Sequence, residues 1–298
     1  MQGVKAQSTL TGEQPWRRLS LPPMPSFTDY LKTFPVQPLL PLAHSTSFLH
    51  FRDILSSHVL TPTPCTVFKD EELLYLFYGR PAYRVSRGVL GSPQLRHLPV
   101  CFLLQPDAIT TPKRVYPFDS GAFMSNLFKN FLTGLDLDNF ALLDDFPKTL
   151  QRLISAFYGS NLNYYYGKMD GPASGSPLDI EVNAYLAMLR DTGVAFASES
   201  TSSDDRRYTI EIQADSSIQL AAEDAADANG NMVVRNRVVA VALPLPALGE
   251  DEIMEPVTKI WKAEPITYPT YGFAKPEEYH SVIRDKIAEF LIKRGVLR

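Results

Sequence analysis

The chain has 298 residues, of which 45% are hydrophobic and 21% are charged, and its formal net charge at pH 7 is -4. This composition is typical of a soluble globular protein with a sizeable core, and the net charge excludes a global electrostatic attraction to nucleic acid. Two cysteines, Cys65 and Cys101, are too few for a disulfide framework and lack metal-binding spacing, so we expect buried thiols in a reducing compartment. No apolar run reaches membrane-spanning length and no signal peptide is recognisable, which predicts a cytoplasmic location without a membrane partner.

The N-terminal segment, residues 1–40, is rich in proline, serine and threonine. Proline removes backbone donors and disfavours regular pairing, so we expect an extended, proline-rich arm. Its interspersed aromatic and leucine residues favour an arm that lies along the rest of the protein, and a flexible tail is the alternative. We expect residues 41–298 to form a single domain.

Residues 42–60 predict a short strand followed directly by an amphipathic helix. The strand delivers His44 and Thr46 to a turn, and Ser47 is placed to cap the helix from Phe48 to Leu60. Apolar residues recur at three- and four-residue spacing and give this helix a core-facing side. His44 therefore lies at a strand end beside a helix start, where folds commonly place ligand-binding side chains.

The same stretch contains His-x-Thr followed by apolar residues seven, ten and eleven positions after the histidine. The residues of this pattern are His44, Thr46, Phe51, Ile54 and Leu55. The pattern resembles the first nucleotide-binding motif of ADP-ribosyltransferases, and it is most similar to the branch of bacterial toxins that modify DNA. The resemblance implies that His44 opens the first core strand and holds the nicotinamide ribose of NAD, with Thr46 beside it. It also implies that the following helix packs the nicotinamide half of the cleft.

Residues 74–78 form an aromatic run that is typical of a buried strand, which a glycine and Pro81 then end. In the resembled family the second core element supplies an aromatic ring that stacks on nicotinamide, and the candidates here are Tyr78 and Tyr83. The toxin branch follows a similar run with an arginine and a proline, and Arg80-Pro81 matches them loosely. We therefore expect Arg80 and Tyr83 to be exposed near NAD, and the alternative is that the tyrosines are packing residues.

Residues 98–104 predict another strand, and residues 113–123 predict a turn-rich segment with two basic residues. Arg114 or Asp119 is placed to bind the pyrophosphate or a ribose of NAD. The alternative is a structural turn held by Asp119 and Gly121.

Residues 124–191 predict a mostly helical insertion between the sheet strands. Apolar residues have helical spacing over 124–132, 146–158 and 180–191. The tyrosine-rich segment 163–167 predicts an exposed aromatic cluster that either stacks a base or serves as a packing patch.

Residues 204–213 predict a strand whose alternation places Glu211 on the polar face. A glutamate in the middle of a half-buried strand costs free energy unless it has partners or a function. The resembled family ends its pattern with a glutamate on a late core strand, followed by one more strand pair. Residues 218–220 and 238–243 follow in that order here, so the resemblance implies that Glu211 is catalytic.

Two alternatives to this role of Glu211 remain open. The carboxylate could pair with Arg206 or Arg207 at the sheet surface and have a structural role. Glu181 is the rival catalytic carboxylate, although it lies near a predicted helix start, where acidic residues are favoured by the helix dipole alone. The last predicted helix, residues 276–294, has a packing face and no residues that point to chemistry.

Short strands scattered around a helical block predict an α+β fold. The resemblance implies the ADP-ribosyltransferase form of it, a split, mostly antiparallel sheet that brings His44, Tyr78 and Glu211 into one cleft. It implies an NAD-dependent mono-ADP-ribosyltransferase that modifies DNA, RNA or protein and releases nicotinamide, with NAD as substrate and no metal. The alternatives are an NAD-hydrolysing enzyme and an inactive nucleotide-binding or regulatory module on the same scaffold. The resemblance to toxins also implies an antitoxin or another regulatory partner.

Overall fold

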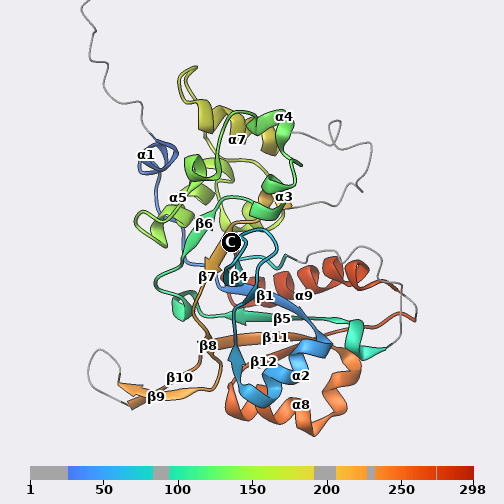
Figure 1. Ribbon diagram of the computed structural model, residues 1–298. Helices are drawn as coiled ribbons and strands as arrows, with labels where there is room; N and C mark the ends of the chain where they lie inside the picture. The colour runs from blue at the N-terminus through green and yellow to red at the C-terminus, as the bar shows by residue number, and fades with distance from the viewer. Residues whose placement is uncertain (1–25, 83–93, 191–205, 227–231, 273) are drawn as a thin grey trace, which may run out of the picture.

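The structure of the protein is a computed structural model that describes residues 26–82, 94–190, 206–226, 232–272 and 274–298 (Figure 1). Two sequence-based predictions fall on residues outside these ranges: the contact of Tyr83 with NAD, and the part of the N-terminal arm formed by residues 1–25. Within them the chain combines a mostly antiparallel sheet with several helices, which confirms the predicted α+β class.

Within the described residues the main sheet has eight strands, in the spatial order β12–β11–β5–β1–β4–β7–β6, with β3 paired to the start of β4. Every neighbouring pair is antiparallel except β11 and β12, which are parallel. The bounds of these strands are β1 Leu42–Ser47, β3 Thr63–Pro64, β4 Glu72–Tyr78, β5 Pro99–Leu104, β6 Arg114–Tyr116, β7 Glu211–Ala214, β11 Val238–Pro244 and β12 Glu264–Tyr268. Two small ladders join β2 to β8 and β9 to β10, with bounds β2 Val59–Leu60, β8 Ile218–Gln219, β9 Glu223–Ala226 and β10 Met232–Arg235.

The sheet separates between β1 and β4. These strands pair only through Leu42 and Ala43, although β1 continues along β5 as far as Ser47. On the other side of the separation, β4 pairs with β7 from Leu74 to Phe77. From His44 onward, β1 therefore pairs with β5 and no longer with β4, whereas β4 pairs with β7.

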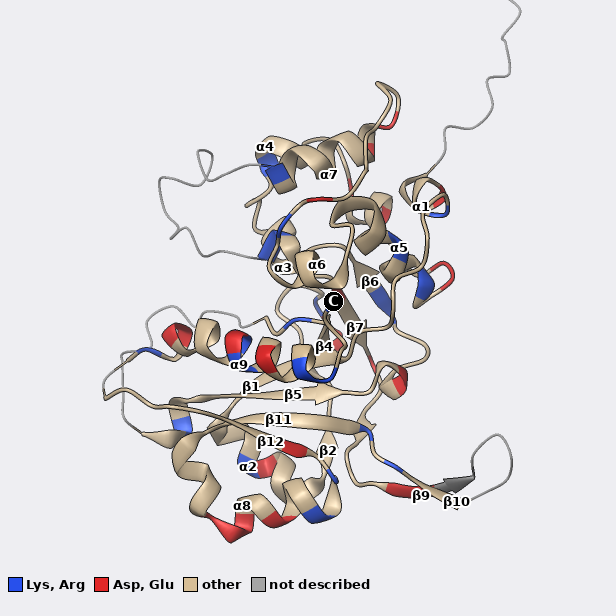
Figure 2. Cartoon of the chain, turned by 180° about the vertical axis from the view of Figure 1, so that it is seen from behind, with Lys and Arg blue, Asp and Glu red and all other residues tan. Residues whose placement is uncertain are grey.

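Helices cover both faces of the sheet and one of its ends. In Figures 1 and 2, α9 lies on the opposite side of β5 and β11 from α2 and α8, while α3 to α7 gather beside β6 and β7. The bounds of the helices are α1 Phe27–Leu31, α2 Phe48–Ser57, α3 Ser120–Met124, α4 Lys129–Leu132, α5 Lys148–Phe157, α6 Asn161–Tyr165, α7 Ile180–Arg190, α8 Asp251–Glu255 and α9 Tyr279–Lys293. No helix in the described part of the chain is long and apolar enough to span a membrane.

The predicted strand at residue 42 and the helix that starts at Phe48 are confirmed, but the helix ends at Ser57 and not at Leu60. His58 has a φ of +57° there, and Val59–Leu60 form β2.

The Ser47 side chain caps α2 by accepting a hydrogen bond from the amide of His50. Phe51 buries its ring against Phe102 of β5 and against Trp261, with centroid distances of 5.8 and 6.2 Å. This aromatic cluster fixes α2 on the sheet directly after the strand that carries the histidine.

The predicted helical insertion is present as α3 to α7, but its first part differs from the prediction. Residues 124–132 are divided between two short helices, and the segment predicted as turns contains β6, an edge strand that pairs with β7. The predictions for α5 and α7 are confirmed. The tyrosine cluster of α6 is mainly a packing patch, because Tyr164 and Tyr165 are buried and only Tyr166 is exposed, at 51%.

The described part of the N-terminal arm is not extended throughout. Ser26 caps the short helix α1, and Leu40 is buried where the chain returns to the sheet. Leu40 passes so close to Gly79 that a Cβ atom at Gly79 would lie 2.4 Å from the leucine Cδ1. Since Gly79 also has a φ of +73°, glycine is required there by both space and backbone conformation.

Candidate functional site

Glu211 lies on β7 in the interior of the sheet, directly between Phe77 of β4 and Tyr116 of β6. Its exposed fraction is 0%, and Thr209 and Gln213, two residues away on either side, are equally buried. The predicted polar face of this strand is therefore a buried one. A carboxylate in such a position needs hydrogen-bond donors, because burial of an unpaired charge is strongly unfavourable.

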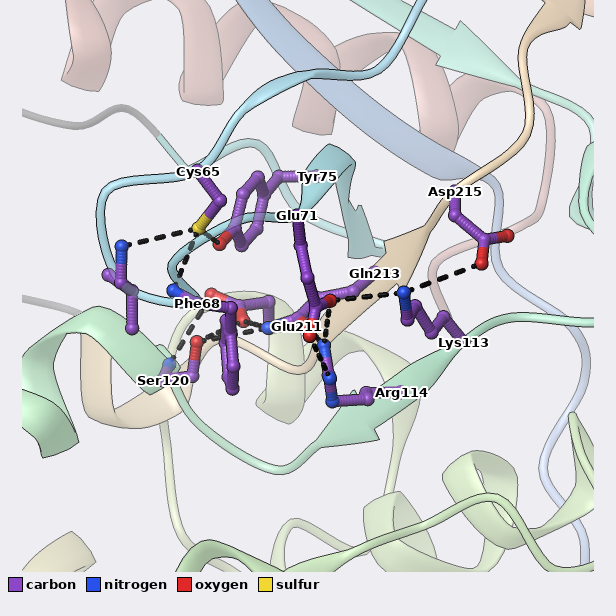
Figure 3. A network of polar contacts seen from close by, with 11 residues as sticks. Cys65, Phe68, Glu71, Tyr75, Lys113, Arg114, Ser120, Glu211, Gln213 and Asp215 are labelled. Carbon is purple, nitrogen blue, oxygen red and sulfur yellow. Dashed lines mark hydrogen bonds and ion pairs between the residues drawn. The ribbon is translucent and has the colours of Figure 1, made fainter.

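Ser120 and Gln213 provide such donors (Figure 3). The hydroxyl of Ser120 donates to Glu211 Oε1 over 2.6 Å, and its backbone amide donates to Oε2 over 3.3 Å. The side-chain amide of Gln213 donates to Oε1 over 2.7 Å and to Ser120 Oγ over 3.1 Å. We call Ser120, Glu211 and Gln213 the inner network.

The position of Ser120 follows from a local sequence signal. Asp119 caps α3 by accepting a hydrogen bond from the amide of Ala122 over 2.6 Å, so Ser120 becomes the first residue of the helix. This supports the structural alternative for Asp119. The capping residue places the serine amide and hydroxyl against the carboxylate of a strand far away in the sequence.

A second group of charges borders the inner network, and Figure 3 shows it around Glu71. Arg114 donates to both carboxylate oxygens of Glu71, over 2.8 and 2.6 Å, and Lys113 lies 3.1 Å from the same group. These hydrogen bonds, from Arg114 first and Lys113 second, lower the pKa of Glu71 to about 2. Arg114 also donates to Gln213 Oε1 over 3.2 Å. We call Glu71, Lys113 and Arg114 the outer ion-pair cluster.

The loop before β4 is held against this site by sulfur and aromatic contacts. Cys65 Sγ accepts from the amides of Val67 and Phe68, over 3.3 and 3.2 Å, and lies 2.8 Å from the hydroxyl of Tyr75. The guanidinium of Arg114 lies over the ring of Phe68, with its carbon atom 4.3 Å from the ring centroid. Cys101 is the buried thiol that the sequence predicts, whereas Cys65 is half-buried.

His44 lies at the separation between β1 and β4. Its Nδ1 is 2.9 Å from the carbonyl oxygen of Tyr75, a group that only accepts, so Nδ1 carries the proton and donates. Burial lowers the pKa of His44, which favours the neutral ring. Nε2 is then a hydrogen-bond acceptor, and no hydrogen bond to it is found among the described residues. Thr46, two residues further along β1, is half-buried.

Tyr78 and Arg80 occupy packing positions. The exposed fraction of Tyr78 is 1%, and its hydroxyl accepts a hydrogen bond from the amide of Leu40 over 3.1 Å. Burial raises the pKa of Tyr78 to about 12. Arg80 was expected to be exposed, but its exposed fraction is also 1%, and it lies beside the carbonyl of Tyr164. The fold closes over both side chains because α6 packs on the end of β4.

The strands bring the three residues of the predicted His–Tyr–Glu set close in the sheet but not onto one face. β1, β4 and β7 are consecutive neighbours. Glu211 is paired with Phe77 and Phe77 with Ala43, so alternation places Glu211 on the face opposite to Tyr78 and His44. The predicted single cleft would therefore have to include the separation between β1 and β4.

Sequence reasoning missed the partners of Glu211. Gln213 had a visible signal, because it follows Glu211 by two residues in an alternating strand. For Ser120 the sequence contains no signal other than the helix-capping pattern at Asp119. The rival carboxylate, Glu181, lies in the first turn of α7, where the helix dipole accounts for an acidic residue.

A cavity of about 740 Å³ lies away from these residues. It is bounded by the end of β5, the segment before β1 and the strand β10, and its apolar lining includes Leu39, Ile109, Phe146 and Val234. None of the predicted site residues that the structure describes lines it. The cavity therefore adds nothing to the site around Glu211.

Neither a family model, nor a curated protein, nor a solved structure matches this chain.

Proposed function

We propose that this protein binds NAD and transfers its ADP-ribose to a macromolecular acceptor, with release of nicotinamide. The observation that carries the proposal is the buried carboxylate of Glu211, held by Ser120 and Gln213 on a strand two places from the one that carries His44. The order of these strands in the sheet supports the resemblance, in which a histidine strand, an aromatic strand and a glutamate strand supply one nucleotide site.

The chemistry accounts for the need for this carboxylate. The bond between the ribose carbon and the nicotinamide nitrogen breaks, nicotinamide leaves with the electron pair, and positive charge develops on the ribose. A nucleophilic oxygen or nitrogen of the acceptor then bonds to that carbon and loses its proton. Glu211 would stabilise the developing cation, and because its donors already hold it in place, little reorganisation is needed during the reaction.

His44 would hold the nicotinamide ribose. Its Nδ1 is occupied by the carbonyl of Tyr75, so the neutral ring offers Nε2 as an acceptor for a ribose hydroxyl. This interaction exists in the ground state as well as in the transition state, so it contributes to NAD affinity. Stacking on nicotinamide stays a prediction for Tyr83, since the ring of Tyr78 is enclosed by its neighbours.

A second candidate function has a specific observation in its favour. Glu211 has an exposed fraction of 0%, and Tyr78 is also enclosed, so neither side chain is open to a reacting substrate, which favours a scaffold without turnover. A regulatory module of this kind would bind NAD and leave it intact.

The test is incubation of the full-length protein with NAD labelled in the nicotinamide or in the adenylate part, in the presence of DNA, RNA and protein. We expect free nicotinamide and adenylate label on one acceptor class. Release of nicotinamide without any acceptor would indicate an NAD hydrolase. Binding without release would indicate the regulatory module, and the absence of both would refute an NAD site.

Glu211→Gln gives the sharper prediction. The substitution keeps size and removes the negative charge, so nicotinamide release should fall by about 10²- to 10³-fold while the Kd for NAD changes little. Glu181→Gln is the matched control and should leave release unchanged. If Glu181→Gln abolishes release and Glu211→Gln does not, the catalytic carboxylate has been assigned to the wrong residue.

A further inference from the structure

Glu211 and Gln213 project from the same face of β7 and face two residues of β6. Tyr116 is paired with Glu211, and Arg114 is paired with Gln213. Both side chains of β7 are completely buried. These two side chains of β7 are joined by the hydrogen bond from Gln213 Nε2 to Glu211 Oε1.

The surroundings determine which way the Gln213 amide points. A guanidinium only donates, so the amide oxygen must face Arg114, whose Nη1 lies 3.2 Å away. The NH₂ group is then directed at Glu211 and Ser120. Arg114 cannot turn away easily, because Glu71 binds it through two hydrogen bonds and Phe68 lies beneath it.

The direction of this amide also sets the direction of the Ser120 hydroxyl. Gln213 donates to Ser120 Oγ, so the serine oxygen already accepts a hydrogen bond and its own hydrogen is directed to Glu211 over 2.6 Å. Oε1 of Glu211 thus receives two donors whose orientation depends on Gln213. Donors of this kind favour the ionised carboxylate and fix its position.

We propose that Gln213 is a positioning residue, oriented by Arg114, that holds the carboxyl group of Glu211 aimed for the transfer reaction. This inference rests on the proposed function. It gives Arg114 a different role from the NAD contact that the sequence suggests, since Arg114 acts on the carboxylate through the amide between them.

The chain offers a matched pair of variants for the test. Lys113 and Arg114 are adjacent and both pair with Glu71, but among the described residues only the Arg114 side chain contacts the side chain of Gln213. Lys113 reaches Gln213 through backbone atoms, its amide donating to the Gln213 carbonyl over 2.7 Å, and its side chain also lies 3.6 Å from Asp215. Arg114→Met and Lys113→Met each remove one positive charge and one ion pair with Glu71. With full-length protein, kcat and KM for NAD are measured from nicotinamide release for the wild type, both variants and Gln213→Leu.

We expect Gln213→Leu and Arg114→Met to lower kcat by about 10- to 100-fold with KM for NAD changed less than about twofold, because a small displacement of a catalytic group has effects of this size. Lys113→Met should retain wild-type kcat. A raised KM with normal kcat in Arg114→Met would mean that Arg114 binds NAD, and equal losses in the Lys113 and Arg114 variants would mean a general charge effect. Either result overturns the inference.

A second readout separates this inference from the proposed function. The pKa of the Glu211 carboxyl is measured by carbon NMR in the wild type and in Gln213→Leu. The substitution leaves the ionisable side chains that border the inner network, Tyr116, Arg114 and Glu71, unchanged. Loss of the amide donor should raise this pKa. If the wild type releases no nicotinamide but the pKa rises, the proposed function fails and Gln213 still holds the carboxylate. If the pKa is unchanged, the positioning role fails whatever the activity.

Discussion

The protonation state of His44 links the site to the stability of the fold. Burial lowers its pKa below the usual value of 6.5, so between these two pKa values the unfolded chain binds a proton that the folded chain does not. The free energy of unfolding should therefore decrease as the pH falls below about 6.5, and this decrease should stop once the pH is below the pKa of His44 in the folded protein. Denaturant unfolding at a series of pH values would measure this.

His44→Gln is the informative variant for that measurement. A glutamine amide can still donate to the carbonyl of Tyr75 but does not titrate, so the decrease in stability below about pH 6.5 should be smaller than in the wild type. Parallel profiles for the two proteins would show that His44 is not the group responsible.

Tyr78 provides a test of packing at the end of β4. Its hydroxyl is the acceptor for the buried amide of Leu40, so Tyr78→Phe leaves that amide without this partner. Such a loss costs about 1–3 kcal/mol, which should appear as a lower midpoint of denaturant unfolding. An unchanged midpoint would mean that Leu40 finds another acceptor, and the packing role assigned to Tyr78 would then need revision.

At the scale of elements, α1 fastens the N-terminal segment to the helical insertion. Phe27 is 1% exposed and lies among the rings of Phe140, Phe157 and Tyr185, at centroid distances of 5.4, 6.0 and 5.5 Å. Phe27→Ala should destabilise the protein by about 3–5 kcal/mol, because it leaves a cavity among three aromatic side chains. Thermal unfolding would measure the loss. Phe34→Ala, at a half-buried ring of the same segment, is the control and should have a smaller effect.

Local patterns predicted the elements with continuous apolar spacing. The strand that carries His44, the helix after it, α5, α7 and α9 were all found near their expected bounds. The prediction failed for the segment at β6, because its three strand residues lie between turn-forming ones and are stabilised by pairing with β7, a partner that is remote in sequence. Strands are present at residues 218–219 and 238–244, in the predicted order after Glu211, but the pattern contains no information about their partners. The former pair with β2, and the latter join β5 and β12.

At the scale of the whole molecule, the sequence could indicate Glu211 but not its surroundings. An alternating strand with an acidic residue is visible in a short window, whereas the inner network depends on Ser120, which the Asp119 cap brings from another part of the chain. The burial of Tyr78 and Arg80 likewise depends on α6, which is packed over them by the insertion. Contacts of this kind are fixed by the order of strands and helices in space, and periodicity contains no information about that order.

That order has a consequence for the synthesis of the protein. β7 lies between β4 and β6, yet it follows both of them, and all the helices of the insertion, along the chain. While a ribosome is producing the insertion, β4 is without its neighbour on this side, and β6 is without the one strand with which the structure pairs it. Open strand edges are sites of wrong pairing, and long-range pairing is slow. The nascent chain must therefore keep this half of the sheet open until the segment with Glu211 has emerged, so the proposed catalytic strand is also the one that completes this half of the sheet.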